Sequence, residues 1–255
     1  MTFVLLSLAS SVAWFFSTLA GGGSPLILIP LVNFLLGSAA VPPIITLGML
    51  AGNAQRAWLY WRDNDWQVTA WFLPGAIAGA ILGAYTFTQI HLEWMQILIG
   101  LFLILLVISY ASGKKESIFN LKVWYFLPLA FLKSFVSGMI GSTGPILNSF
   151  FLSYGLEKEQ MVATKAVNFT VLHLVKIITY ISLGAMTPEY FGYGLIIGVA
   201  AFPGNLLGQY VLSKMSVQQF RQVVLTFMAI TGFLMVWQQR QLFGMGGFIL
   251  GIGNF

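Results

Sequence analysis

Residues 14–25 read WFFSTLAGGGSP and residues 134–145 read SFVSGMIGSTGP, and these two stretches decide the fold. Each interrupts a long apolar run, at 3–36 and at 122–154, with glycine followed by proline. A run of about 33 residues would form a helix about 50 Å long. The apolar core of a bilayer is only about 30 Å thick. We therefore predict that each run forms two helical pieces with a break between them.

The two breaks belong to an internal repeat, because Ser17, Gly21 and Pro25 lie 120 residues before Ser137, Gly141 and Pro145. Glycine and threonine matches at similar spacings continue the pattern: Gly37 with Gly155, Thr46 with Thr164, Gly79 with Gly204, and Gly83 with Gly208. We predict two homologous four-helix repeats, at 1–111 and 123–255, joined by a charged linker at 112–122. The pattern leaves open whether the repeats are parallel or inverted, because a re-entrant half-helix in each would invert them.

The composition predicts an all-α polytopic membrane protein. The chain is 58% hydrophobic and only 7% charged, whereas soluble domains have about 25% charged residues. It has no cysteine, which excludes thiolate catalysis and iron–sulfur clusters. In such a chain the net charge of +5 indicates positive loops or buried cations rather than binding to nucleic acid. The expected transmembrane segments, about eight, lie near 3–36, 42–61, 67–88, 94–111, 122–154, 161–184, 190–212 and 219–238, with an apolar tail at 242–255.

The N-terminal run is read as part of the mature chain. No Lys or Arg precedes it, and the n-region of a signal peptide requires such a charge. We therefore expect Met1 to begin the mature protein.

Each break has the residue types of a helix start inside the membrane. Proline is favoured at the first helical position, which places Ser24 and Gly144 at N-cap positions. A helix N-terminus favours an anion by about 0.3–1 kcal/mol. The alternative is that the glycines only let neighbouring helices pack closely. The predicted anion-binding residues at the breaks are Gly21, Gly22, Gly23, Ser24, Pro25, Gly141, Ser142, Thr143, Gly144 and Pro145.

Cations, but no carboxylates, fall inside the predicted segments. All seven Asp and Glu residues lie in or beside the loops. Lys133 lies eleven residues into its segment, near the bilayer centre, where a lysine costs about 2.5–3.5 kcal/mol. It either binds an anion or is tied to backbone carbonyls at the nearby break. A pore with this charge pattern should prefer anions.

Further polar residues share helix faces. At 100° per residue, Lys165, Asn168 and Lys176 lie on one face of the helix at 161–184, with His173 on its flank. Asn53 and Arg56 likewise share a face of the helix at 42–61. We include all six as candidate substrate-binding residues. Lys165 could instead snorkel to the surface, and His173 could be a satisfied core residue. No second His or Cys lies nearby, so we expect no metal and no other cofactor.

The stretches GGGSPLILIPLV and GSTGPILNSFFLSYGLEKEQMVATKAVNF resemble the sulfite exporter TauE/SafE family over nearly the whole chain. The resemblance rests on the Gly-rich break with its proline, on Gly37 and Gly155, and on the Ala163-Thr164 start of the next helix. It implies a multi-pass permease of the bacterial inner membrane with two related four-helix halves. It also implies export of small organosulfur anions such as sulfite, sulfonates or sulfoacetate. Ser142 and Thr143 interrupt the second break, which is usually richer in glycine in this family.

The leading hypothesis is a membrane exporter of such anions, not an enzyme, that binds its substrate near the bilayer midplane between two half-helix N-termini. The alternative is a non-transporting membrane scaffold or assembly factor that uses the Gly-rich faces for packing. That alternative predicts no water-accessible cavity at the breaks. An intramembrane enzyme built on Ser24, Ser142 and His173 is disfavoured, because no Asp or second base accompanies them.

Overall fold

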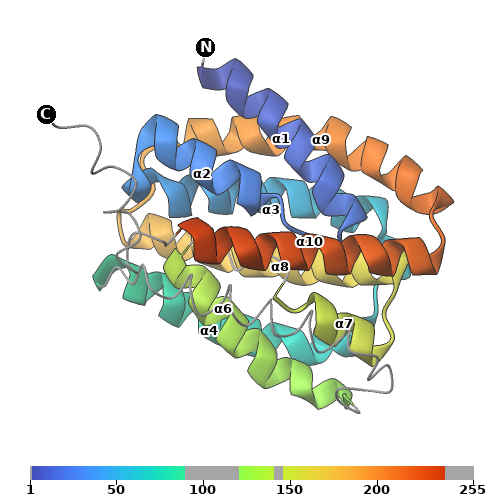
Figure 1. The fold of residues 1–255 in the computed structure, drawn as a ribbon. Coiled ribbons are helices and arrows are strands. Elements are labelled where there is room, and N and C mark those ends of the chain that lie inside the picture. The colour runs from blue at the N-terminus through green and yellow to red at the C-terminus, as the bar shows by residue number, and fades with distance from the viewer. Residues whose placement is uncertain (1, 90–120, 141–145, 239–255) are drawn as a thin grey trace, which may run out of the picture.

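The computed structural model describes residues 2–89, 121–140 and 146–238, and this part of the chain is helical without a strand (Figure 1). The predicted segment at 94–111 and the tail at 242–255 lie outside the described residues. The helices are α1 (Thr2–Leu19), α2 (Pro25–Leu36), α3 (Val41–Leu59), α4 (Trp66–Gln89), α6 (Phe126–Ile140), α7 (Asn148–Tyr154), α8 (Lys158–Ser182), α9 (Pro188–Lys214) and α10 (Val217–Gln238). Three short 3₁₀ turns, η1 (Ser38–Ala40), η2 (Trp61–Asp63) and η3 (Val123–Tyr125), connect them.

The first apolar run is interrupted where the sequence predicts. α1 ends at Leu19 and α2 begins at Pro25. The second run also forms two helices, α6 and α7, although the break at 141–145 lies outside the described residues. α7 begins at Asn148 rather than at Pro145, because the two residues before Asn148 form a turn.

Four of the described helices are long and apolar enough to cross a bilayer. Many large apolar side chains on the outer faces of the bundle are exposed, among them Phe34 and Val199. Such a surface fits contact with lipid. The helical stretches that meet the length and composition criteria are Thr2–Leu19, Trp66–Thr86, Lys158–Ser182 and Pro188–Lys214.

α1, α3 and α9 run in the same direction. A Cβ atom added at Gly204 of α9 would lie 2.1 Å from the Ser11 carbonyl oxygen of α1, and one at Gly208 would lie 3.2 Å from that of Phe15. Four residues along α9 thus correspond to four residues along α1, so the two helices are parallel. The contacts of α9 with α3 advance in the same way: Gly194 with Leu47, and Gly198 with Ala51.

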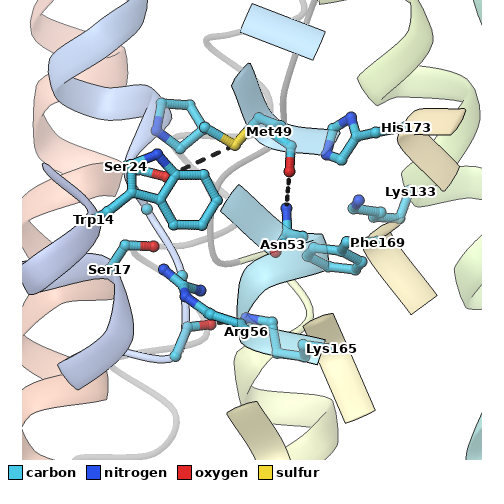
Figure 2. A pocket seen from close by; sticks show the side chains of 14 residues that line it. Trp14, Ser17, Ser24, Met49, Asn53, Arg56, Lys133, Lys165, Phe169 and His173 are labelled. Carbon is cyan, nitrogen blue, oxygen red and sulfur yellow. Dashed lines mark hydrogen bonds between the residues drawn. The ribbon is translucent and has the colours of Figure 1, made fainter. Parts of the chain in front are cut away.

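α4, α6 and α8 run in the opposite direction. On α4, the glycines 75, 79 and 83 face the carbonyl oxygens of Leu127, Phe131 and Phe135 of α6, at 2.1, 2.2 and 2.0 Å from an added Cβ. α8 runs parallel to α4. Near the start of both helices the Asp65 N–H donates to Thr164 Oγ1, and further along both helices Phe72 contacts Phe169. α8 is antiparallel to α3: Met49 lies level with His173 in Figure 2, and Ala57 packs against Ala166.

Two apolar clusters hold the bundle together, and each draws helices from both predicted repeats. One joins α1, α2, α3 and α9 around Trp14, Leu28 and Ile197. The other joins α4, α6, α7, α8 and α10 around Phe72 and Phe126. Figure 1 shows α1 and α9 on one side of the molecule and α4 and α6 on the other. α3 and α8 lie between them and provide polar residues at the centre.

Candidate functional site

The break between α1 and α2 has a backbone that only glycine adopts readily. Gly21, Gly22 and Gly23 have φ angles of +62°, +133° and +120°, in the region that L side chains avoid. The Gly22 N–H donates to the Ser17 carbonyl at 2.6 Å. In the described part of the chain, no backbone carbonyl accepts from the N–H groups of Gly23 or Ser24. The break therefore offers two backbone donors to a ligand.

Ser24 occupies the N-cap position of α2, but its side chain does not cap the helix. Its Oγ instead donates to the Met49 sulfur at 3.7 Å. Pro25 follows at the first helical position, where it has no N–H to satisfy. The Ser24 hydroxyl therefore leaves the amides at the start of α2 to the backbone turn formed with Gly23 and Ser24.

A cavity lies between this break and helices α3, α6 and α8 (Figure 2). The cavity volume is about 30 Å³, and about 10–15 Å³ by this measure is enough to hold a water molecule. Ten of the residues predicted from sequence line it: Gly21, Gly22, Gly23, Ser24, Pro25, Asn53, Arg56, Lys133, Lys165 and His173. The cavity thus lies between elements of both predicted repeats.

The cavity is at mid-height in the bundle. On α8, Lys165, Phe169 and His173 line it, and they are centred near the midpoint of a helix that spans Lys158–Ser182. Lys133 lies seven residues into α6 rather than eleven, because residues 123–125 form the turn η3 and α6 begins only at Phe126. It is still in the middle of its fifteen-residue helix.

Lys165 holds the first break in place. Its ammonium donates to the Gly21 carbonyl oxygen and to Asn148 Oδ1. The other side of the same amide, Asn148 Nδ2, donates to the Ala20 carbonyl at 3.1 Å. Lys165 is only 4% exposed, so it does not snorkel to the surface. The sequence analysis considered a hydrogen bond from Lys133 to a backbone carbonyl at the break. In the structure it is Lys165 that makes such a bond.

Lys133 lines the cavity, and no Asp or Glu of the described residues pairs with it. Its Nζ lies 3.7 Å from the centroid of the Phe169 ring. No hydrogen bond joins it to the described residues, and it is 6% exposed. An aromatic face stabilises a cation only in part. None of the three N–H donors of Lys133 is therefore used by a hydrogen bond to a described residue.

Arg56 and His173 also have polar atoms without partners. Arg56 Nε donates to Asn205 Oδ1 at 2.9 Å, and its guanidinium lies 4.4 Å from the centroid of the Trp14 ring. Within the described residues, Arg56 Nη2 and His173 Nδ1 are buried and have no hydrogen-bond partner. Asn53 is less free, because its Nδ2 donates to the Met49 carbonyl at 2.8 Å in its own helix. Buried polar atoms without partners are rare in proteins, and a ligand in the cavity would satisfy them.

Two predicted residues on α8 do not line the cavity. The face that does is centred on Phe169, and at 100° per residue Asn168 points about 100° away from it. Lys176 is on the same face of α8 as Phe169, but it lies seven residues, about 10 Å, beyond Phe169 along the helix. Its Nζ donates to the Ser137 carbonyl at 2.9 Å. The predicted residues Gly141, Ser142, Thr143, Gly144 and Pro145 lie outside the described part of the chain.

The structure adds residues that the sequence did not single out. Ser17 lines the cavity with a buried hydroxyl that has no partner among the described residues, and its match to Ser137 in the repeat was a usable signal. Asn148 stood out only as an amide inside an apolar run. The other additional lining residues are Trp14, Met49 and Phe169. Aromatic and Met residues are usually core filling, so these gave no separate signal.

Basic side chains make up the ionisable lining of the cavity among the described residues. Arg56, Lys133 and Lys165 line it, and no Asp or Glu of the described residues does. Across residues 2–89, 121–140 and 146–238, no group of three or more His, Asp or Glu side chains could hold a metal ion. The chemistry that this arrangement supports is the binding of an oxyanion by amides and cations.

Comparison with known proteins gives a family. A family model described as "Sulfite exporter TauE/SafE" matches residues 6–235. Searches of curated proteins and of solved structures returned no match. Since the family match covers nearly the whole chain and the long apolar helices fit a membrane transporter, the chain belongs to the sulfite exporter TauE/SafE family, whose members are membrane transporters of sulfite and organosulfur anions rather than enzymes.

Proposed function

We propose that this chain exports a small organosulfur anion, such as sulfite or a sulfonate, across the inner membrane of a bacterium. The substrate binds in the cavity between the α1–α2 break and α8. The observation that carries the proposal is the convergence of Arg56, Lys133 and Lys165 on one mid-height cavity that no described carboxylate lines. Burial of these cations is costly, and binding of an anion offsets that cost.

The substrate oxygens are held from two sides. On one side are the N–H groups of Gly23 and Ser24 at the start of α2, where the helix dipole also favours an anion. The Lys133 ammonium lies across the cavity beside Phe169, and the unpaired Arg56 Nη2 belongs to a guanidinium that lies over Trp14 of α1. Charge-assisted hydrogen bonds of this kind are roughly twice as strong as neutral ones. A tetrahedral or pyramidal oxyanion has enough acceptor atoms to meet both sides at once.

The proposal includes two repeats of about four transmembrane segments each, at 1–111 and 123–255, related by inversion. Helices that correspond between the repeats run in opposite directions, α1 against α6, α3 against α8, and α4 against α9. The Gly204–Ser11 contact also has its counterpart in the Gly79–Phe131 contact, with each partner shifted by the repeat spacing. Inverted repeats with a site at their interface support alternating access.

Export needs no coupling ion under this proposal. An inside-negative membrane potential drives one negative charge outward with about 2.3 kcal/mol per 100 mV. The described residues place no carboxylate at the cavity, which is where a sodium- or proton-coupled carrier usually has one. The potential alone is the proposed driving force.

The cavity favours a transporter over a scaffold. A scaffold that used the glycine faces only for packing would gain nothing from burying Lys133, whose insertion costs about 2.5–3.5 kcal/mol. It would also have no use for unpaired amides beside an open space. The Gly75, Gly79 and Gly83 contacts of α4 are packing contacts, but they lie away from the cavity.

The test is sulfite flux in proteoliposomes under a potential imposed with a potassium ionophore. We expect potential-dependent flux that falls at least about tenfold in the Lys133→Ala variant. The Lys214→Ala variant is the control, because Lys214 is exposed at the end of α9 and, among the described residues, bonds only Tyr210. Absence of flux at every potential would reject the transport function. Equal flux in wild type and Lys133→Ala would reject the site.

A further inference from the structure

Among the residues that the structure describes, none offers a negative group to a ligand in the cavity. Of the ionisable residues that the structure describes, its lining contains only Arg56, Lys133, Lys165 and His173. The described carboxylates all belong to loops or to the first turns of helices: Asp63, Asp65, Glu157, Glu159 and Glu189. A ligand that carried a positive charge would therefore meet cations without a counter-ion.

Three neutral groups at the cavity that could hold an ammonium already contact cations of the protein. A cation can be stabilised by a carbonyl oxygen or by an aromatic face. The Gly21 carbonyl accepts from Lys165. The Trp14 ring carries the Arg56 guanidinium at 4.4 Å, and the Phe169 ring carries the Lys133 ammonium at 3.7 Å. The protein's own cations thus occupy these positions.

We infer that the site discriminates among sulfonates by their second group: it accepts those in which that group is neutral and rejects those in which it is an ammonium. This inference rests on the proposed function and narrows its substrate class. The discrimination is achieved by repulsion and by the missing counter-ion. Such features against the wrong ligand are a common source of specificity. A pocket that merely lacked room would instead select by size.

Two sulfonates of similar size but different charge test whether the site selects its ligand by charge or by size. 2-Hydroxyethanesulfonate and 2-aminoethanesulfonate have the same carbon chain and differ by a hydroxyl in place of an ammonium. Each is added in a concentration series to proteoliposomes that carry out potential-driven sulfite flux, at pH 7. We expect the hydroxyl compound to compete with sulfite and the ammonium compound to be at least about tenfold weaker. Equal competition by the two compounds, or no competition by the hydroxyl compound, overturns the inference.

A charge reversal tests the cause. Lys133→Glu places a carboxylate on the Phe169 side of the cavity, and Lys133→Gln removes the charge without adding a negative one. We expect Lys133→Glu to raise the relative competition by the ammonium compound at least about tenfold and Lys133→Gln to leave its rejection in place, because Arg56 and Lys165 remain. If the Lys133→Glu variant fails to fold, the comparison of the two sulfonates in the wild-type protein still tests the inference. Loss of sulfite flux in wild type rejects the proposed function itself, whereas flux without discrimination rejects only this inference.

Discussion

The Lys165 ammonium on α8 donates a hydrogen bond to the Gly21 carbonyl oxygen, at the point where α1 gives way to the turn into α2. A cation from the second half of the chain thus fixes the break in the first half. Asn148, at the start of α7, accepts from the same ammonium and donates to the Ala20 carbonyl. The shape of the candidate anion site therefore depends on residues that are far away in sequence.

Replacement of Asn148 by Asp should weaken anion binding. The change puts a carboxylate against the Lys165 ammonium, which neutralises part of the positive charge of the cavity. We expect the KM for sulfite to rise about tenfold or more, measured by flux in proteoliposomes. The loss of the Nδ2 donor should also lower stability by about 1–3 kcal/mol, because the buried Ala20 carbonyl loses a partner.

The matched control for this change is Asn64→Asp. Asn64 is also buried, but it lies in the turn before α4, where its Oδ1 accepts from Thr69 at 3.2 Å. Its replacement should leave the KM unchanged. A similar rise in KM for both variants would show that the effect is not specific to Lys165.

Replacement of Gly23 by Ala should disrupt the first break. The added Cβ would lie 1.9 Å from Phe227 Cε1 on α10, at a φ of +120°. We expect a loss of flux and a large fall in the unfolding temperature. Gly37→Ala separates the two causes, because Gly37 has a φ of +85° and nothing within 4 Å. That variant should cost only the backbone strain, about 1–3 kcal/mol for a conformation that is essentially restricted to glycine.

Combining Gly23→Ala with Phe227→Ala should recover part of the stability, because it removes the clash and leaves the backbone strain. Thermal unfolding in detergent, followed by circular dichroism, measures each variant. If the double variant is no more stable than Gly23→Ala, contact with Phe227 is not the cause.

The glycines at the α4–α6 and α1–α9 contacts should be intolerant of side chains to a similar degree. An added Cβ at Gly79 would lie 2.2 Å from the Phe131 carbonyl oxygen, and one at Gly204 would lie 2.1 Å from that of Ser11. Both neighbours are backbone atoms and cannot rotate away. We expect either Ala variant to unfold at a clearly lower temperature than wild type.

Gly192→Ala is the control for this pair. Gly192 lies on α9, as Gly204 does, but an added Cβ would have nothing within 4 Å. It should be neutral or gain up to about 1 kcal/mol from the higher helix propensity of Ala. Destabilisation by Gly192→Ala equal to that by Gly204→Ala would mean that close packing does not explain the effect.

The cavity should be open to water-soluble reagents, and the chain suits this test because it contains no cysteine. We expect a Ser17→Cys variant to react with an anionic thiosulfonate reagent, since Ser17 lines the cavity. Added 2-hydroxyethanesulfonate should slow the reaction by occupying the site. Mass spectrometry of the labelled protein follows the rate.

Ser10→Cys is the control for labelling. Ser10 is on the same helix, but its hydroxyl donates to the Ile197 carbonyl at 2.6 Å and it is fully buried between α1 and α9. It should react at least about tenfold more slowly. Equal rates at the two positions would mean that α1 is exposed generally and that no defined cavity is reached.

The first break and most helix boundaries could be predicted from sequence because they depend on local chemistry. Glycine followed by proline both ends one helix and begins the next, so Pro25 is where the sequence places it. α6 begins four residues later than expected, since nothing in the apolar run distinguishes the turn at residues 123–125 from helix. Apolar composition alone does not separate a 3₁₀ turn from the first turn of an α-helix.

The roles of individual polar residues were less predictable, because they depend on which atoms meet across the bundle. The helical spacing placed Lys165 on one face of its helix with Asn168 and Lys176, but it could not show that the Gly21 carbonyl lies within reach of Lys165. The same spacing included Asn168, which points away from the cavity. Asn148 was missed, since its importance comes only from the neighbourhood of the first break.

The parallel pairs α1–α9 and α4–α6 are each made of one helix from either half, joined by glycines whose neighbours are backbone atoms. The bodies that could rock against each other are therefore composite, and neither corresponds to a continuous stretch of the chain. Severing the polypeptide between the halves would leave each fragment with a bare glycine stripe and no partner for it. The two fragments would then fold only together, as the subunits of an obligate heterodimer do.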